Sequence, residues 1–418
     1  MTPRPAQTKD VRMHGFAQRS EVEVAQAWVD GRAGARPLPA QAVAVEESAG
    51  RVLAADLVAP IDVPTFQRAA MDGFALRGAE TDGASEYNPI ELPVLGQALP
   101  GRPYEGKGEV PPRTAVRIMT GAPLPDGLDA VVPAEYATEA AGRIAITRPV
   151  SPWQHVGRVG EDIQAGSTVL PAGRRLRPQD GGLAASLGFA QLDVVRRPRV
   201  RLLVTGNEVV APGAPKGPWE IYDANSVLLR GLIARDGAEL ESHQRLGDEA
   251  AAIGAAMCAP GADVVLVSGG SSVGSEDHAP QLLAQLGELA IHGVAMRPSS
   301  PAGMGRIGDT LVFLLPGNPV SCLCAYDFFA GRAIRRLAGR GPEWPYRQRR
   351  ATVARKIVSA VGRVDYVRVR LEGDAVEPLA VSGASVLSST TRADGFVVVP
   401  AESEGYGPGT ELTLHLYD

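Results

Sequence analysis

The feature that most constrains the fold is a regular alternation of short apolar runs and helical segments between Arg199 and Leu337. The expected strands are VRLLVTG, AELESHQRL, ADVVLVSGG, IHGVAMRP and TLVFLLPG, and the expected helices cover residues 223–234, 249–258, 279–289 and 319–337. Strands that alternate with helices at this spacing usually pair in parallel, with helices on both faces of the sheet. We therefore expect a doubly wound, mostly parallel α/β domain.

Three of these strands end in polar turns, at residues 205–208, 268–277 and 316–319. The carboxyl ends of parallel strands lie on one edge of a sheet, where glycine lets a phosphate approach the backbone closely. A capping turn explains any one of these segments as well, but three on one edge favour a phosphate-bearing ligand. The candidate ligand-binding residues of the last two turns are Ser268, Gly269, Gly270, Ser271, Ser272, Gly274, Pro316, Gly317, Asn318 and Pro319.

Acidic residues accompany these turns. Glu208 belongs to the first turn, Asp277 ends the second, and Asp248 follows the strand AELESHQRL. Magnesium is bound by carboxylates together with substrate phosphates, so these three acids are candidate Mg²⁺ ligands. Acids that complement a helix dipole are the alternative explanation, and the loop 268–277 by itself does not decide between the two.

The segment before the α/β domain has a different character. Met71-Asp72-Gly73-Phe74 sets an acid beside a glycine and an aromatic at an expected turn, and residues 89–148 show short apolar runs between Pro and Gly, which predicts a β-rich domain. Thr120 is a polar residue of that domain, and Asp162 belongs to the turn Gly160-Glu161-Asp162-Ile163 that opens the next segment.

From Gln348 onward, alternating runs separated by Gly, Ser and Pro predict a small antiparallel sheet or barrel. The stretch SSTTR, residues 388–392, interrupts them. Hydroxyl groups and an arginine can hold an oxyanion, although an exposed loop explains the same residues.

Composition excludes several classes of protein. A chain of 418 residues is too long for one core and predicts three or four domains. A formal net charge of -5, without a sustained Lys/Arg tract, argues against nucleic acid or a membrane as the main partner. Three cysteines form no disulfide framework, and the first residues lack the apolar core of a signal peptide, so we expect a cytoplasmic protein.

Eight motifs, in order and at family spacing, make the chain from about Ser20 to its end resemble molybdopterin molybdenumtransferase, the MoeA or gephyrin E-domain family. They are AAMDGFA, IMTGAPLPDGLDAVVPAE, GEDI, VTGNEV, IYDANS, SGGSSVG followed by Asp277, LPGNPVS and SSTTRADGF.

The resemblance implies four domains: a discontinuous, partly helical domain (17–50 and 161–197), a β-rich domain inserted into it (51–160), the α/β molybdopterin-binding domain (198–346) and a C-terminal β-barrel (347–418). It also implies a homodimer whose active cleft is shared between subunits. Asp72 and Thr120 of one subunit would then face the metal-binding acids of the other, and Asp162, Ser388, Ser389 and Arg392 match further positions of the cleft.

The activity that the resemblance implies is insertion of molybdate into adenylylated molybdopterin with release of AMP, with Mg²⁺ as the cation. In this scheme Asp72, Thr120, Asp162 and Glu208 are the catalytic candidates. The molybdopterin adenylyltransferase and molybdoenzyme chaperones are further candidate partners.

The sequence departs from the family at the lysine-rich segment. Arg297-Pro298-Ser299-Ser300-Pro301 stands where a KPGKP-like motif is usual, so Arg297 keeps a positive charge and Ser300 loses one. Gly293 falls where some relatives carry lysine, and Asn207 where Asp is usual. Arg297 and Ser300 stay candidate oxyanion-binding residues. A non-catalytic carrier of the pterin, or a paralogue with altered oxyanion preference, is therefore an alternative; a dehydrogenase is disfavoured because no G-x-G-x-x-G turn follows the first strand.

Overall fold

The structure is a computed structural model that describes residues 19–34, 37–271, 277–380 and 383–417. Its contacts divide the chain into two compact units. The β-rich unit contains residues 44–49 and 55–192, and the α/β unit contains residues up to 43, residues 50–54 and residues from 193 onward. The finer division into four domains stays a prediction.

A six-stranded mixed sheet organises the α/β unit, in the order β16-β13-β17-β21-β20-β18. The first four strands are parallel to one another, and β20 and β18 are antiparallel to their neighbours. The expectation of a mostly parallel sheet is therefore met by four of the six strands. The strands are β13 (Arg199–Thr205), β16 (Glu239–Leu246), β17 (Val264–Ser268), β18 (Glu288–His292), β20 (Gly303–Ile307) and β21 (Thr310–Leu315).

The expectation of one strand over IHGVAMRP is wrong. The chain leaves the sheet at Gly293, where φ is +92°, and Met296–Arg297 (β19) pairs with a strand of the C-terminal sheet instead. The sequence pattern also misses β20, because its glycines are unusual in strands. A Cβ at Gly305 would lie 1.9 Å from the Glu288 carbonyl oxygen, so the close approach of β18 and β20 requires glycine there.

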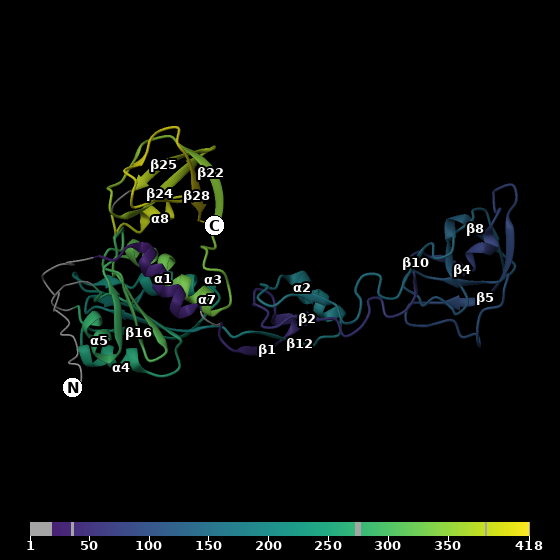
Figure 1. Cartoon of the computed structure of the whole chain (residues 1–418), viewed down its shortest axis with the longest axis horizontal. Helices are drawn as coiled ribbons and strands as arrows, with labels where there is room; N and C mark the ends of the chain where they lie inside the picture. The colour runs from purple at the N-terminus through teal and green to yellow at the C-terminus, as the bar shows by residue number, and fades with distance from the viewer. Residues whose placement is uncertain (1–18, 35–36, 272–276, 381–382, 418) are drawn as a thin grey trace. The chain divides into compact units, whose positions relative to one another are not determined.

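Helices cover both faces of this sheet, because consecutive strand residues point to opposite sides. Leu202 and Leu266 pack in one core with helices α1, α3, α6 and α7, whereas Leu203 and Val265 pack in a second core with α4 and α5. Figure 1 shows α1, α3 and α7 on one side of β16 and α4 and α5 on the other. The helices are α1 (Val22–Ala33), α3 (Asn225–Arg235), α4 (Ala250–Cys258), α5 (Ala279–Leu286), α6 (Pro319–Ala325) and α7 (Gly331–Leu337), with a π-helical turn at Tyr326–Ala330 between the last two.

The C-terminal strands form a closed ring. Strand β22 pairs with β28 and β25, β28 pairs with β26, and β24 pairs with both β26 and β25, while β19 adds to β24. The expected sheet or barrel is thus a small barrel, visible in Figure 1. Its elements are β22 (Arg347–Val353), β24 (Val364–Glu372), β25 (Ala375–Ala380), β26 (Gly395–Val399) and β28 (Glu411–Leu416), with β23 (Ile357–Val358) paired to β27 (Gly405–Tyr406), and the short helix α8 (Ser388–Thr391).

The β-rich unit contains a six-stranded sheet of its own, in the order β7-β4-β6-β5-β9-β8, which is antiparallel except for the β5–β6 pair. Its strands are β4 (Gly73–Leu76), β5 (Ile90–Ala98), β6 (Ala115–Ile118), β7 (Ala130–Pro133), β8 (Ala137–Ala140) and β9 (Arg143–Ile146). Smaller pairs join β3 (Arg68–Ala69) to β10 (Val156–Gly157) and β2 (Leu57–Val58) to β11 (Thr168–Leu170), and α2 spans Pro178–Ser186. Strand β1 (Ala40–Ala44) pairs with β12 (Gln191–Val195).

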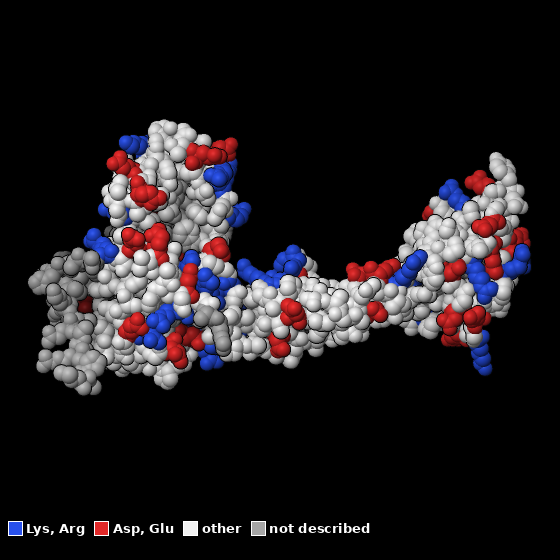
Figure 2. Space-filling view, in the orientation of Figure 1, with Lys and Arg blue, Asp and Glu red and all other residues white. Residues whose placement is uncertain are grey.

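Charges of both signs are interspersed on the face shown in Figure 2, as the near balance of 42 basic and 47 acidic residues leads one to expect. Within the described part of the chain, no helix is long and apolar enough to cross a membrane.

Candidate functional site

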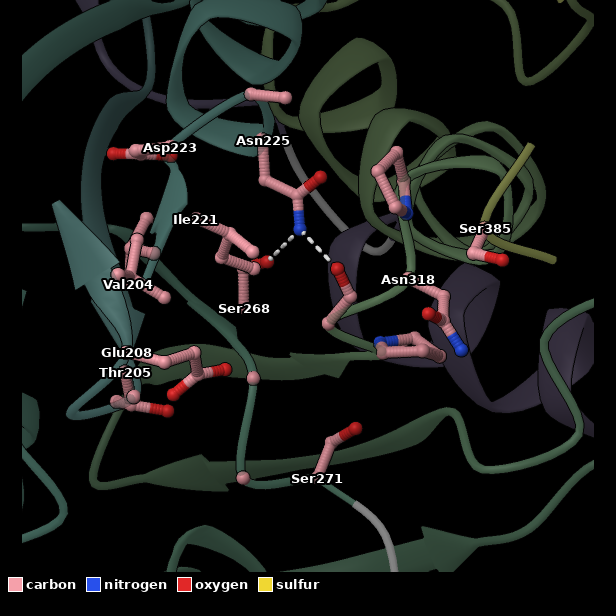
Figure 3. Close-up of a pocket in the computed structure, with 18 of the residues that line it drawn as sticks. Val204, Thr205, Glu208, Ile221, Asp223, Asn225, Ser268, Ser271, Asn318 and Ser385 are labelled. Carbon is pink, nitrogen blue, oxygen red and sulfur yellow. Dashed lines mark hydrogen bonds between the residues drawn. The ribbon is translucent and has the colours of Figure 1, made fainter. Parts of the chain in front are cut away.

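The three expected strand-end turns do meet at one edge of the α/β sheet. Strands β13, β17 and β21 are neighbours and end at Thr205, Ser268 and Leu315, so the residues that follow them surround a common cavity. We call it the acidic cavity; its volume is about 720 Å³ (Figure 3). Among the predicted site residues, those that line it are Glu208, Asp248, Ser268, Gly269, Gly270, Ser271, Asp277, Pro316, Gly317, Asn318 and Pro319. Ser272 and Gly274 lie outside the described residues.

Glycine is required where the second turn passes the first. Gly269 has φ of +99°, and a Cβ there would lie 2.4 Å from the Thr205 carbonyl oxygen. Gly270 has φ of +56°, and its Cβ would lie 3.1 Å from the Thr205 hydroxyl. The close approach of the two turns therefore requires glycine at position 269, and position 270 leaves little room for a side chain.

Asn225 connects separate parts of the cavity wall by hydrogen bonds. Its Nδ2 donates to Ser268 Oγ at 2.9 Å and to the Gly317 carbonyl at 2.7 Å, which links α3 to the ends of β17 and β21 (Figure 3). Its Oδ1 and the hydroxyl of Thr205 are buried without a hydrogen-bond partner among the described residues. Since buried polar groups are nearly always satisfied, two such atoms in one cavity indicate a bound ligand or water.

Four carboxylates line the acidic cavity, and none of its described lining residues is Lys, Arg or His. Asp223 is buried and accepts from the backbone N of Ser226 at 2.8 Å. Asp248 Oδ2 accepts from the backbone N of Asn207 at 3.0 Å, and Asn207 Oδ1 accepts from the backbone N of Asp248 at 3.2 Å. Asn207 thus cross-links two loops of the site.

The three predicted metal ligands share this cavity but do not form a closed cluster. Within the residues that the structure describes, no group of three His, Cys, Asp or Glu side chains could hold a metal ion by itself. The Cys322 thiol lies beneath the cavity, 3.7 Å from Ser268 Oγ, and burial raises its pKa to about 12. It is a neutral structural thiol.

A second cavity, of about 780 Å³, adjoins the first and shares Pro301, Pro316 and Asn318 with it. We call it the basic cavity, because Arg19, Arg297 and Arg363 line it and none of its described lining residues is Asp or Glu. The predicted residues Arg297 and Ser300 both lie here. Arg297 Nε and Ser300 Oγ are buried without a hydrogen-bond partner among the described residues.

Asp365 forms ion pairs with two of these arginines, Arg297 and Arg363. It is fully buried, forms an ion pair with Arg297, and accepts from Arg363 Nε at 3.1 Å and from Ser359 Oγ at 2.9 Å. Arg297 comes from β19 and Arg363 from the residue before β24, so the basic cavity lies where the α/β sheet and the barrel meet.

Asp72 and Thr120 lie together in the β-rich unit. The backbone N and the Oγ1 of Thr120 both donate to Asp72 Oδ1, each at 2.7 Å. The backbone bond and then the hydroxyl bond lower the pKa of this exposed carboxyl below its ordinary value. Asp162 is also exposed, and its backbone N donates to the Val63 carbonyl at 3.0 Å; the described contacts do not join it to Asp72.

Ser388, Ser389 and Arg392 line neither cavity. They belong to α8 and its end, where the Ser389 hydroxyl donates to the Val386 carbonyl at 2.6 Å and Arg392 Nε donates to the Ser388 carbonyl at 3.1 Å. In this arrangement these groups stabilise their own helical turn. Ser385, a few residues earlier, lines the acidic cavity instead.

Sequence reasoning did not single out several residues of the two cavities: Asp223, Asn225, Ser385, Arg19 and Arg363. Asp223 and Asn225 lie inside the motif IYDANS, and a polar pair at the start of a helix could have been recognised as a wall of the site. For Arg19 and Arg363 no local pattern exists, because they reach the cavity through the packing of distant segments.

Three family models match the chain: the MoeA N-terminal region (domains I and II) at residues 20–188, a probable molybdopterin binding domain at 201–336, and the MoeA C-terminal region (domain IV) at 350–417.

Curated relatives and solved structures agree with these matches. Molybdopterin molybdenumtransferase 2 of Mycobacterium tuberculosis is 36% identical over 89% of this chain and 94% of its own. The molybdopterin molybdenumtransferase of Haemophilus influenzae is 32% identical over 91% and 95%. The crystal structure of a molybdopterin biosynthesis MoeA protein from Pyrococcus horikoshii superposes with a TM-score of 0.81, at 33% identity over 96% of this chain and 100% of that one. The chain therefore belongs to the MoeA family.

Proposed function

We propose that this protein is a molybdopterin molybdenumtransferase of molybdenum cofactor biosynthesis, which inserts molybdate into adenylylated molybdopterin and releases AMP. The observation that carries the proposal is the pair of adjoining cavities. Among the described residues, one is lined by four carboxylates and no cation, and the other by three arginines and no acid. This division of charge suits the two substrates. The pyrophosphate of adenylylated molybdopterin requires a metal ion, which acids can hold, and molybdate is an oxyanion, which arginines can bind.

The acidic cavity fits a phosphate only together with a cation, because Glu208, Asp248 and Asp277 would otherwise repel it. The charge of the fourth carboxylate, Asp223, is balanced by Arg245 at 3.6 Å. Glu208, Asp248 and Asp277 would hold Mg²⁺, which when bound supplies charge neutralisation on the pyrophosphate oxygens. The residues Ser268 to Ser271 and Pro316 to Pro319 would receive the phosphate. Neither the Thr205 hydroxyl nor Asn225 Oδ1 has a partner among the described residues; the hydroxyl would donate to the phosphate, and Oδ1 would accept from its water shell.

The basic cavity suits molybdate, which is a substrate. Arg297 and Arg363 are held by Asp365, so their positive charge is oriented without a lysine-rich segment. Ser300 adds a hydroxyl that has no hydrogen-bond partner among the described residues. Charge-assisted hydrogen bonds from arginine are well suited to an oxyanion, and they compensate here for the family lysines that the chain lacks.

We further propose that the active enzyme is a homodimer with the four-domain division expected from the sequence. In this arrangement Asp72, Thr120 and Asp162 of one subunit face Glu208, Asp248 and Asp277 of the other. Asp72, an anion near neutral pH, would orient molybdate or accept a proton near the dithiolene. Ser388, Ser389 and Arg392 stay candidate contributors to the cleft, although they line neither cavity in the single chain.

The direct test follows AMP release and molybdenum incorporation from adenylylated molybdopterin with Mg²⁺ and molybdate. We expect Asp277→Asn to abolish Mg²⁺-dependent AMP release, while Asp309→Asn, an exposed acid in the β20–β21 turn, leaves it unchanged. Tight pterin binding without AMP release by the unaltered protein would instead establish a carrier. A lower requirement for tungstate than for molybdate would establish an altered oxyanion preference.

Subunit complementation tests the shared cleft. Asp72→Asn and Asp277→Asn homodimers should each be inactive. Random mixing through refolding makes half of the dimers hybrid, with one unaltered site each, so about a quarter of full activity should return. No recovery in a mixture that analytical ultracentrifugation shows to be dimeric would place both acids in the same subunit's site.

A further inference from the structure

One backbone position in the basic cavity has an uncommon conformation. Among the described residues, five that are not glycine have a positive φ, and Ser299 is the buried one of the five, at 3% exposure. Its φ is +88°, in the left-handed region, which costs free energy for a residue that has a Cβ. Such conformations persist only where the surroundings enforce them, and they cluster at functional sites. Ser299 lines the basic cavity beside Ser300.

Three hydrogen bonds hold the backbone at this position. The Ser299 hydroxyl donates to the Ser321 carbonyl of α6 at 2.5 Å. The Ser299 carbonyl accepts from the backbone N of Ala302, and the Ser300 carbonyl from the backbone N of Val294, each at 2.9 Å. The last two bonds lie within residues 294–302, whereas the hydroxyl bond joins this loop to a helix that is buried in the core. The hydroxyl bond therefore sets the position of the loop relative to the α/β sheet.

The neighbouring hydroxyl is the group that depends on this position. Ser300 lines the basic cavity, and its Oγ is buried without a hydrogen-bond partner among the described residues. Buried hydroxyls are nearly always satisfied, so a ligand or water in the cavity is the partner left to it. Arg297, at the other end of the loop, is held separately by its ion pair with Asp365. The bond of Ser299 therefore acts on Ser300 rather than on Arg297.

We propose that Ser299 is a positioning residue of the oxyanion site. Its bond to the Ser321 carbonyl holds the loop in the left-handed conformation that directs the Ser300 hydroxyl to the oxyanion. This inference rests on the proposed function, in which the basic cavity binds molybdate, and it adds a residue that acts through Ser300. The alternative is that the bond only stabilises the fold. The two roles can be separated, because the backbone conformation and the hydroxyl bond contribute to stability with opposite signs.

Two substitutions of Ser299 make this separation. Ser299→Gly removes both the hydroxyl bond and the cost of the positive φ, which are of similar size, so the urea midpoint of unfolding should change little. Ser299→Ala removes the bond but keeps the cost, so it should lower the midpoint. Calorimetric titration of the full-length protein with molybdate should show an affinity about three- to tenfold weaker in both variants. In the AMP-release assay the KM for molybdate should rise and kcat should stay unchanged. Unchanged molybdate affinity in Ser299→Gly would overturn the positioning role.

A double-mutant cycle tests whether Ser299 acts through Ser300. Ser300→Ala should weaken molybdate binding by about tenfold or more, and adding Ser299→Gly to it should weaken binding no further. Effects that multiply in the double variant would overturn this link. Ser48→Ala is the control, because the buried Ser48 hydroxyl also donates to a backbone carbonyl, that of Val45 at 2.6 Å, and lines neither cavity. It should leave molybdate affinity unchanged.

Arg297→Gln separates this inference from the proposed function. It removes a positive charge from the basic cavity and should weaken molybdate binding if the cavity holds the oxyanion. Weaker binding in Arg297→Gln together with unchanged binding in Ser299→Gly would overturn the role of Ser299 and leave the proposed function in place. Unchanged binding in Arg297→Gln would remove the oxyanion from the basic cavity, and both proposals would fall.

Discussion

At the scale of single residues, the ionisation of Asp72 is set by one neighbour. Thr120 donates to the same carboxylate oxygen through its backbone N and its hydroxyl, and the backbone bond lowers the pKa more. These bonds favour the charged form of Asp72. Their contribution to folding stability is complete above the ordinary pKa of 3.8, and it is lost as the pH falls through the lower pKa of the folded protein. Near neutral pH, Asp72 is an anion.

Removing the Thr120 hydroxyl alone should therefore raise the pKa of Asp72 without returning it to its ordinary value. In Thr120→Ala the backbone bond remains, so the pKa of Asp72 should rise but stay below 3.8. Carbon NMR titration of the carboxyl groups, assigned with Asp72→Asn, measures it. Thr114→Ala, whose hydroxyl donates to the Pro111 carbonyl, is the control and should leave the pKa unchanged. An unchanged pKa in Thr120→Ala would show that the hydroxyl does not contribute.

The site residues that sequence reasoning found are those that carry a local pattern. Gly269, Gly270 and Asn318 sit in turns directly after strands, where glycine and helix-start residues are recognisable one by one. Arg363 precedes a barrel strand and reaches the basic cavity only through Asp365 and the pairing of β19 with β24. No spacing in the chain encodes that contact, because tertiary packing creates it.

At the scale of elements, the close passage of the turn after β17 over the end of β13 depends on Gly269. Gly269→Ala adds both a strained φ and a Cβ 2.4 Å from a backbone oxygen that cannot move freely. Gly308, in the β20–β21 turn, also has positive φ, but open space surrounds it. Gly308→Ala should cost roughly 1–2 kcal/mol of unfolding free energy, the backbone strain alone.

Gly269→Ala should cost more, by about 1–3 kcal/mol beyond that strain, because the turn must also shift. It should weaken pyrophosphate binding as well, whereas Gly308→Ala should not. Urea unfolding and calorimetric titration of both variants measure the two effects. Equal destabilisation by the two changes would mean that the turn adapts to the added Cβ.

Asp365 joins β24 of the barrel to β19, which follows the α/β sheet. Asp365→Asn leaves two arginines, each about a third exposed, without their counter-charge and should lower the unfolding free energy by about 1.5–3 kcal/mol. Asp374→Asn breaks an exposed pair with Arg349 in the same barrel and should cost less than about 1 kcal/mol. Urea unfolding compares them, and similar small losses would show that the buried pair contributes little.

The strands and helices were predictable where the pattern of apolar residues was regular, as in β13, β17, β21 and the helix that begins at Pro319. The prediction failed at β18 to β20, where glycines allow close strand approach and the chain changes sheets at Gly293. Propensity describes each residue in its own segment, and it cannot show which of two sheets a short apolar run joins.

At the scale of the whole molecule, one core continues from the α/β sheet into the barrel. Tyr366 and Phe396 of the barrel belong to the same buried cluster as β13 and β17, and their rings stack with centroids 4.2 Å apart. The connecting segment is fixed by Asp327, which accepts from the Tyr346 hydroxyl at 2.9 Å and, through its carbonyl, from Trp344 Nε1 at 3.0 Å. The buried clusters of the β-rich unit are separate from this core.

The barrel and the α/β sheet should therefore unfold together, and the β-rich unit apart from them. Differential scanning calorimetry should resolve two transitions. Phe396→Ala removes a fully buried ring from the shared core, which costs about 3–5 kcal/mol, and should lower the midpoint of one transition only. Leu92→Ala, in a core of the β-rich unit, should lower only the other. A third transition that moves alone with Phe396→Ala would show that the barrel is independent, and a common shift in both variants would show that the two units unfold as one.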